Sequence, residues 1–201
     1  MAAGEGKRLR PLTERWPKPV LPIDGKPVVV TLVHDLASAG CERIVVVTGH
    51  LAEQVEALLE PLPYDIRFVR QPPGQGSADA VLRAQATPPY LAVAADTVFA
   101  EGDLARFAAA GAGLDGAIAV CGDERPPLWL LGRRVHGFLD PLPGKAPYEL
   151  QDVFRNAIAA GAEVSAIQVG RTRDLTDPAD LVRENFPYLQ RRRLDGGEHQ
   201  A

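Results

Sequence analysis

Short β-branched apolar runs alternate along this chain with longer segments of helical spacing, and this alternation constrains the fold more than any other feature. Arg43–Thr48, with the sequence RIVVVT, is continuous and β-branched, which is typical of a strand buried on both faces. In residues 51–60, by contrast, Leu51, Val55 and Leu59 fall on one face of a helix. Repeated alternation of this kind predicts an α/β fold with a mainly parallel sheet covered by helices on both faces.

The same patterns set the expected elements and the domain boundary. Further strands are expected at Ile66–Arg70, Leu91–Ala95, Ala117–Cys121, Leu128–Leu131 and Val164–Val169. Helices are expected at Val29–Ala39, Leu51–Glu60, Ser77–Thr87, Asp103–Ala110, Tyr148–Ala160 and Pro178–Asn185. We expect one domain over residues 1–188. Residues 189–201 are expected to be a disordered tail, because the end of the chain has no apolar period.

Charge and composition exclude several classes of partner. The formal net charge of −4 argues against a broad surface for nucleic acid or an anionic membrane, because both need clustered positive charge. No apolar run approaches the roughly 18 residues of a membrane helix. Cys41 and Cys121 lie far apart and show neither metal-site spacing nor a disulfide framework. We therefore expect a cytoplasmic protein with reduced thiols and with no nucleic-acid or membrane partner.

The most informative motif is the glycine-rich segment MAAGEGKR. Ala3, Gly4 and Gly6 leave the backbone uncovered, so successive N–H groups can point at an anion. Arg8 follows directly, and Lys18 lies between two prolines that stiffen its placement. The spacing fits neither a Walker A loop nor a dinucleotide-binding fingerprint, which would need a third glycine at position 9. A glycine-rich turn with adjacent cations nevertheless suits a polyphosphate.

The longer segment AAGEGKRLRPLTERWPKPVLPIDGKP resembles the opening motif of the sugar-phosphate nucleotidyltransferases, the family of glucose-1-phosphate thymidylyltransferase and UDP-glucose pyrophosphorylase. This resemblance implies a Rossmann-like fold of the nucleotide-diphospho-sugar transferase type, with Mg²⁺ as cofactor and an NTP and a sugar-1-phosphate as substrates. It also implies that Ala3, Gly4 and Gly6 bind the nucleotide. Arg8 would contact the triphosphate and stabilise the departing pyrophosphate, and Lys18 would contact the phosphate at the reacting centre.

A second motif, QPPGQGSAD, begins at Gln71 and opens an expected helix. A glutamine amide offers both a donor and an acceptor to the edge of a base, and Gly76 permits close approach. The motif is similar to the family's Q-P-x-P-x-G-x-A base-recognition loop, although Gly74 replaces a proline. The resemblance therefore maps Gln71 and Gly76 to base contacts. The alternative is an ordinary link between a strand and a helix.

Two aspartates are the candidate metal ligands. Asp96 follows the apolar run LAVAA, and a hard oxygen ligand at the carboxyl end of a strand suits Mg²⁺. The segment DLTDPADL begins at Asp174 and resembles the family's D-I-G-T-P-E-D-L, so the resemblance implies that Asp96 and Asp174 hold the metal. Asp177 precedes Pro178 and is expected to cap a helix instead. A capping or turn role is also the alternative for Asp96.

Three departures from the family pattern bear on these expectations. The family has an apolar strand before the glycine-rich loop, whereas this chain starts at Met1, where that strand would end. The first strand is therefore expected to be missing, or the start codon has been assigned too late. The family has a hairpin and an E-K-P segment between the middle strands, whereas Val120–Leu128 is short here and carries no such motif. Neither Lys145 nor Glu149 is assigned a role. No acyltransferase or oligomerising domain follows, so the oligomeric state stays open.

The activity predicted from these motifs is condensation of an NTP with a sugar-1-phosphate to give an NDP-sugar and pyrophosphate. The attacking phosphate oxygen is already ionised at neutral pH, so no general base is needed. One alternative is a non-catalytic nucleotide-binding regulatory relative, which the missing strand favours. Another is a cytidylyltransferase acting on a non-sugar phosphate or a molybdopterin. The sequence does not identify the base or the sugar.

Overall fold

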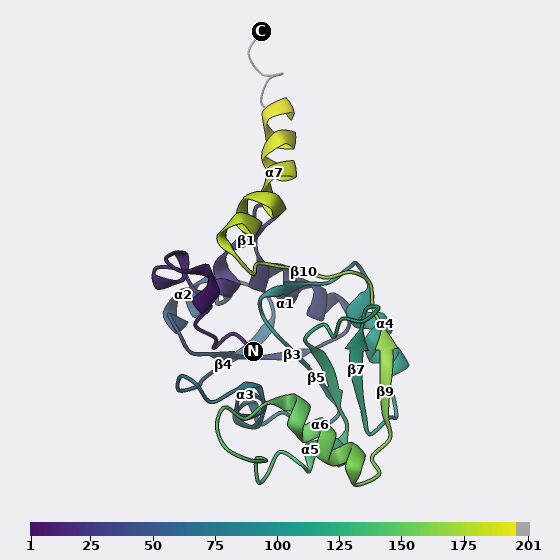
Figure 1. The fold of residues 1–201 in the computed structure, drawn as a ribbon. Helices are drawn as coiled ribbons and strands as arrows, with labels where there is room; N and C mark the ends of the chain where they lie inside the picture. Colours follow the sequence, from purple (N-terminus) through teal and green to yellow (C-terminus); the bar gives the residue numbers. More distant parts are fainter. Residues whose placement is uncertain (196–201) are drawn as a thin grey trace.

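The computed structural model describes residues 1–195, with side chains through residue 188. Its strands form a central layer with helices on both sides (Figure 1). The longer strands are β3 (Arg43–Thr48), β4 (Asp65–Arg70), β5 (Tyr90–Val93), β7 (Gly116–Val120), β8 (Leu128–Leu131) and β9 (Val164–Gln168). The short strands are β1 (Pro22–Ile23), β2 (Lys26–Pro27), β6 (Thr97–Val98) and β10 (Arg173–Asp174). The helices are α1 (Val28–Ser38), α2 (Ala52–Leu59), α3 (Ser77–Ala84), α4 (Asp103–Ala110), α5 (Arg133–His136), α6 (Leu150–Ala159) and α7 (Pro178–Asp195).

The sheet is mixed, because the longer strands form two parallel and two antiparallel pairs. β3 pairs with β4, and β7 with β9, in parallel register. β8 lies between β5 and β7 and runs antiparallel to both, so the order of this part is β5-β8-β7-β9. The short connection from β7 to β8 explains the reversal, because parallel neighbours need a crossover of a dozen or more residues. The expected α/β class is therefore confirmed.

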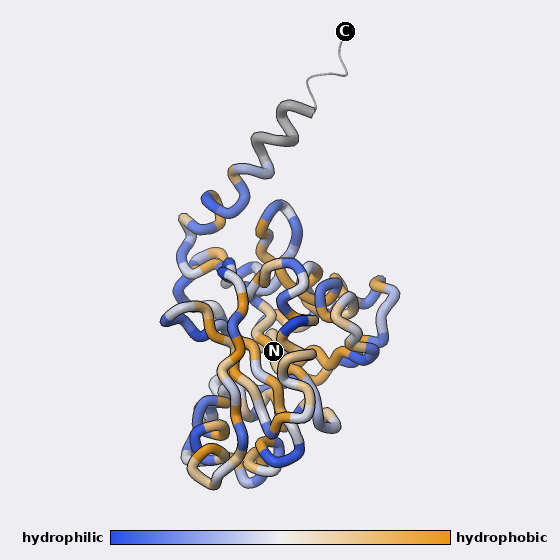
Figure 2. The backbone as a smooth tube through the Cα atoms, turned by 90° about the vertical axis from the view of Figure 1, so that its right-hand side faces the viewer, coloured by the Kyte–Doolittle hydropathy of each residue, from blue (hydrophilic) through white to orange (hydrophobic). Residues whose placement is uncertain are grey.

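Two apolar clusters, one on each face, hold the helices to the sheet. The first joins α1, α2 and α4 to the strands through residues such as Val33, Leu59 and Phe107. The second packs α3, α5 and α6 against the opposite face, with Phe154 and Val135 buried. Hydropathy follows this layering in Figure 2, where the strands are mostly hydrophobic and the outer loops mostly hydrophilic. Within residues 1–195, no helix has both the length and the apolar character needed to cross a membrane.

Met1 and Ala2 lie between β3 and β5 and join them. The Ala2 amide donates to Val47 O at 2.7 Å, and Ala2 forms a parallel bridge with β3. The Met1 amino group donates to Val93 O at 2.8 Å, and Met1 O accepts from the Ala95 amide at 2.9 Å. Burial lowers the pKa of this amino group to about 6, although the nearby negative charge of Asp96 opposes the shift. These two residues occupy the end of the expected first strand, and nothing else in residues 1–195 fills that row of the sheet.

The ends of several elements agree with expectation, and α7 does not. β3, β8 and α4 have the predicted bounds at both ends. α7 was expected to end at Asn185, yet it continues through Pro187 to Asp195, so it extends into the segment expected to be a tail. A proline inside a helical pattern predicts a break, because it removes one backbone hydrogen bond. Residues 196–201 of the expected tail lie outside the described residues.

Candidate active site

The glycine-rich loop folds back on the two segments that follow it. Gly6 has φ +61°, and a Cβ there would lie 2.9 Å from Thr13 Cγ2 and 3.3 Å from Lys18 Cβ. The Thr13 hydroxyl donates to Gly6 O at 3.0 Å. Gly6 is therefore needed both for its backbone angle and for this close approach. The contact holds the glycine-rich loop against the Pro-Leu-Thr segment and the Pro-Lys-Pro segment.

A cleft of about 550 Å³ opens where the carboxyl ends of the parallel strands meet. Its walls include eight of the nine predicted site residues: Ala3, Gly4, Gly6, Arg8, Lys18, Gln71, Gly76 and Asp96. Gln71 follows the last residue of β4, and Asp96 comes shortly after β5. Ligands of open α/β sheets bind at this edge. The sequence-based grouping of these residues therefore corresponds to one place in the fold.

Lys18 and Asp96 form the charged centre of the cleft. Lys18 Nζ lies 2.5 Å from Asp96 Oδ2, and the two side chains are 12% and 30% exposed. Arg8 lies in the short 3₁₀ helix η1 (Lys7–Leu9) on the rim. Among the residues whose side chains are described, 1–188, its exposed guanidinium has no hydrogen-bond or ion-pair partner. The cleft thus presents Lys7 and Lys18, each paired with a carboxylate, and Arg8, which is open to an anionic ligand.

Two hydrogen bonds hold the Gln71 side-chain amide in a fixed orientation. Its Nε2 donates to Gly76 O at 2.8 Å and to Asp79 Oδ2 at 2.9 Å. Both partners can only accept, so the network assigns the nitrogen to this side and turns Oε1 away from it. Asp79 is 6% exposed and is in turn held by Arg83 Nε at 2.6 Å. Gln71 therefore presents an acceptor to the cleft, and Asp79 positions it.

We expect an Asp79→Ala variant to bind nucleotide more weakly without a slower chemical step. Removing Asp79 frees the Gln71 amide to rotate, which costs about 1–2 kcal/mol of oriented hydrogen bonding and raises KM for the NTP about tenfold. Arg83→Gln is the matched control, because it removes only the outer partner of Asp79 and should leave KM within about twofold. A fall in kcat with unchanged KM would contradict a positioning role.

A loop that the sequence did not mark closes the other side of the cleft. Pro147 and Glu149 line it, just before α6. Ser77 Oγ donates to Glu149 Oε2 at 2.6 Å and accepts from the Leu150 amide at 2.8 Å. Tyr148 lies so close that a Cβ on Gly76 would be 2.3 Å from its carbonyl oxygen. The sequence placed Tyr148 and Glu149 at the start of an expected helix and assigned Glu149 no role, which does not reveal that this segment meets the Gln71–Gly76 loop.

Asp174 is the one predicted site residue outside this cleft. β10 pairs with β6, and Asp174 lies opposite Thr97, the residue after Asp96. Its exposed side chain lines a neighbouring cleft of about 860 Å³, and Thr176 lines both clefts. Asp177 lies nearby and caps α7, as expected, by accepting from the Ala179 amide at 2.8 Å.

The donor chemistry of the two aspartates suits a hard divalent cation. Within residues 1–195, no group of three or more His, Cys, Asp or Glu side chains could hold a metal by itself. Mg²⁺ differs from metals that need such a cage, because it is commonly held by one or two carboxylates together with substrate phosphates and water. Asp96 in the cleft and Asp174 in the neighbouring strand β10 are therefore compatible with a Mg²⁺ ion that binds together with the phosphates of a nucleotide.

The fold and the cleft define an α/β domain with a glycine-rich loop and cationic side chains at one edge of its sheet. Residues 1–164 match the family described as the MobA-like NTP transferase domain. The chain therefore belongs to this family, and the resemblance to nucleotidyltransferases inferred from the N-terminal motif is confirmed.

Relatives with curated names are similar over parts of the chain. A 2-aminoethylphosphonate cytidylyltransferase of Lancefieldella rimae is 48% identical over 63 residues, which are 31% of this chain and 26% of that protein. An N-acetylmuramate alpha-1-phosphate uridylyltransferase of Neisseria meningitidis is 37% identical over 105 residues, covering 49% of this chain and 46% of the relative. The matched part therefore spans between about a quarter and a half of these two relatives.

Solved structures extend the likeness of fold over the whole chain. The inositol-1-phosphate CTP transferase from T. maritima superposes with a TM-score of 0.77 at 19% identity, covering 100% of this chain and 95% of that one. At this identity the comparison concerns the fold alone, and it agrees with the nucleotide-diphospho-sugar transferase architecture expected from the sequence.

Proposed function

We propose that this protein transfers a nucleotidyl group from an NTP to a sugar-1-phosphate, giving an NDP-sugar and pyrophosphate. The observation that carries the proposal is the convergence of the glycine-rich loop, Arg8, Lys18 and Asp96 on one cleft. This arrangement places fixed positive charge and uncovered backbone where a triphosphate could lie. Family membership supports the same reaction class.

In the proposed reaction, an ionised oxygen of the acceptor phosphate attacks the α-phosphorus of the NTP. A new P–O bond forms, the bond between the α-phosphorus and the bridging oxygen breaks, and its electron pair leaves with pyrophosphate. Two polyanions must meet, so positioning and neutralisation of charge dominate catalysis. Lys18 stabilises charge at the reacting phosphate, and Arg8 stabilises charge on the departing pyrophosphate.

The proposal includes Mg²⁺, with Asp96 and Asp174 as its protein ligands. When bound between these residues, the ion would supply positive charge that neutralises the phosphates of the nucleotide. The Asp96 carboxylate is paired with the Lys18 ammonium, so it fixes positive charge inside the cleft. Gln71 and Gly76 are proposed to bind the base, with Gln71 accepting a hydrogen bond from it.

The proposed catalytic domain covers residues 1–188. Its C-terminal part supports the segment that carries Lys18, because the Asn185 side chain in α7 accepts from the Gly25 amide at 2.8 Å and donates to Pro22 O at 2.8 Å. We place the reaction in the cytoplasm, with which the two free cysteines are consistent.

A second candidate is transfer of a cytidylyl group to a non-sugar phosphate or phosphonate. The relative with 48% identity is a 2-aminoethylphosphonate cytidylyltransferase, and its matched segment is a third of this chain. An amine-bearing acceptor would need an acidic partner. Among the acidic residues that line the cleft, Glu149, whose carboxylate also accepts from Ser77, is proposed for that contact.

A pyrophosphate-release assay with Mg²⁺ tests both candidates. UTP, dTTP, GTP and CTP are each combined with glucose-1-phosphate, N-acetylmuramate-1-phosphate and 2-aminoethylphosphonate. Release that depends on a sugar-1-phosphate supports the first proposal, and release only with CTP and the phosphonate supports the second. If the protein binds a nucleotide but no combination of NTP and acceptor releases pyrophosphate, both proposed reactions are contradicted. That result would favour the non-catalytic regulatory relative instead.

A further inference from the structure

The turn that joins β3 to α2, residues 49–51, lies against the N-terminal segment at two points. A Cβ on Gly49 would lie 2.8 Å from Ala3 O and 2.9 Å from Ala3 Cβ, so the two backbones are in close contact. The next residue, His50, has its Nε2 atom 2.6 Å from Thr13 O. Because a backbone carbonyl can only accept, this nitrogen carries the proton and donates it. The turn therefore contacts both the start of the glycine-rich loop and the Pro-Leu-Thr segment that follows it.

Thr13 connects this contact to the part of the loop that lines the cleft. Thr13 is 1% exposed, so its carbonyl oxygen is shielded from water and needs a donor from the protein. Its hydroxyl donates to Gly6 O at 3.0 Å. The same Gly6 oxygen accepts from the Leu9 amide at 2.9 Å, which forms the turn of η1 that carries Arg8. A continuous series of hydrogen bonds thus links His50 to the backbone of Arg8.

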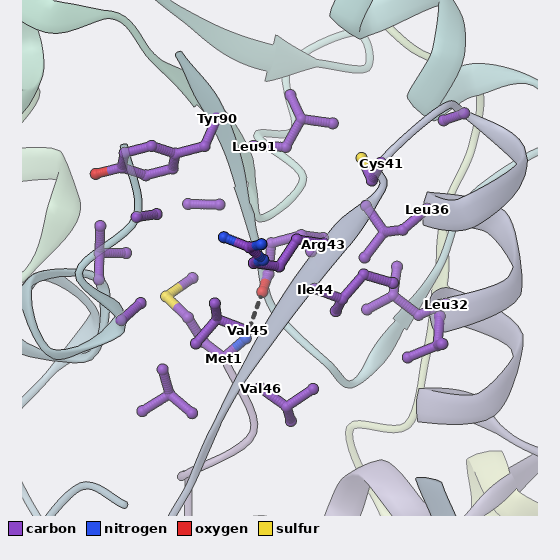
Figure 3. Close-up of a pocket in the computed structure, with 18 of the residues that line it drawn as sticks. Met1, Leu32, Leu36, Cys41, Arg43, Ile44, Val45, Val46, Tyr90 and Leu91 are labelled. Carbon is purple, nitrogen blue, oxygen red and sulfur yellow. Dashed lines mark hydrogen bonds between the residues drawn. The ribbon is translucent and has the colours of Figure 1, made fainter. Parts of the chain in front are cut away.

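The β3–α2 turn is itself held in place. The strand that leads into it is packed on both faces, since Figure 3 shows Leu36 and Ile44 on one side of β3 and Val45 on the other. Leu51, which ends the turn, has φ +50° and ψ 41°, a left-handed conformation that is unfavourable for a bulky side chain. Such a conformation persists only where the surrounding structure determines it, and it is found most often at functional sites.

α2 holds the Pro-Leu-Thr region at a second carbonyl. Gln54 Nε2 donates to Arg15 O at 2.8 Å, so His50 and Gln54 both bind backbone oxygens of the segment that follows the loop. These contacts fix the path of the chain and do not depend on the side chains of the residues that accept. A loop held in this way before its ligand arrives loses less conformational freedom on binding, which favours affinity.

We propose that His50 is a positioning residue for the triphosphate of the nucleotide. Through Thr13 and Gly6 it holds the glycine-rich loop and Arg8 in the arrangement that binds the phosphates, without touching the nucleotide itself. This role rests on the proposed function, because it assigns the loop to an NTP. The acceptor phosphate does not bind to this loop, so the role of His50 is confined to the nucleotide.

Substitutions at two histidines separate the hydrogen bond from packing. His50→Leu removes the donor but keeps a side chain of similar volume, whereas His50→Gln keeps an N–H at the end of the side chain. His34→Leu is the matched control, because His34 lies on the exposed side of α1 with its Nδ1 also 2.6 Å from a partner, Tyr64 Oη. Calorimetry with Mg²⁺ and inorganic tripolyphosphate should show about tenfold weaker binding for His50→Leu. His50→Gln and His34→Leu should stay within about threefold of the parent.

Steady-state kinetics provide a second measurement. His50→Leu should raise KM for the NTP about tenfold and leave KM for the sugar-1-phosphate within about twofold, because the loop holds only the nucleotide. Adding Thr13→Val to His50→Leu should weaken binding little further, since both changes break the same series of hydrogen bonds.

The possible results distinguish the role of His50 from the reaction itself. Parental tripolyphosphate binding by His50→Leu would overturn the role, even if the urea midpoint fell, and so would a His50→Gln variant as weak as His50→Leu. An equal rise in both KM values would also contradict it. If the parent binds tripolyphosphate but releases no pyrophosphate with any pair, the proposed reaction fails and the binding assay still decides the role of His50. A parent that does not bind tripolyphosphate would contradict both.

Discussion

A Lys18→Ala variant is expected to lose about 10²–10³-fold in the rate of nucleotidyl transfer while keeping its fold. Lys18 lies at the centre of the cleft, with its ammonium 2.5 Å from Asp96 Oδ2 and only 12% of its side chain exposed. A cation held this way needs little reorganisation when charge develops on the reacting phosphate, which is why its removal affects kcat. Lys18→Arg keeps the charge but changes its shape, and should recover only part of the rate.

Asp96→Ala is expected to show a loss of similar size, because it removes both the partner of Lys18 and the proposed metal ligand. Arg15→Ala is the matched control, since Arg15 is an exposed cation of the same N-terminal region outside the cleft. Initial rates of pyrophosphate release and urea midpoints are measured for all variants. If the Lys18 or Asp96 variant keeps the parent rate with an unchanged urea midpoint, the assignment of that residue is wrong.

The sequence predicted the fold well where local pattern and tertiary environment agree. β3 is apolar and β-branched because it is covered on both faces, so its bounds could be predicted at both ends. The four-residue helix α5 is too short to show a helical period, and it is held by Val135 in the core. α7 was predicted too short, since its helical spacing was followed only to Asn185, whereas the helix continues through Pro187 to Asp195. Such differences come from packing, which a local pattern does not contain.

For the site, sequence motifs identified residues more readily than the contacts between them. The motifs grouped Arg8, Lys18 and Asp96 correctly in one cleft, because each follows or precedes an element that a pattern can detect. They could not reveal that Asp79 holds Gln71 or that Glu149 closes the cleft, since these contacts join segments from different elements. The roles of all these residues, including Asp174 as a metal ligand, remain predictions for the experiments above.

A Gly76→Ala variant is expected to be destabilised by about 3–4 kcal/mol and to bind NTP poorly. Gly76 has φ +88° and ψ 175°, a region that is essentially restricted to glycine. A Cβ there would also lie 2.3 Å from Tyr148 O and 2.6 Å from Tyr148 N. Relief of this clash moves Tyr148 and breaks its backbone hydrogen bonds to Gln75 and Ala78, each 2.8 Å long. Strain and lost hydrogen bonds together give the expected cost.

A Gly74→Ala variant measures the cost of the left-handed backbone angle without the cost of a steric clash. Gly74 lies in the same loop at φ +73°, but a Cβ there would meet nothing within 4 Å. This variant should therefore lose only about 1 kcal/mol, from the left-handed conformation alone. Urea unfolding and NTP titration of the two variants measure the difference. Equal losses of stability in the two variants would mean that the contact between the Gln71–Gly76 loop and Tyr148 contributes nothing to stability. The segment before α6 would then not close the cleft from that side.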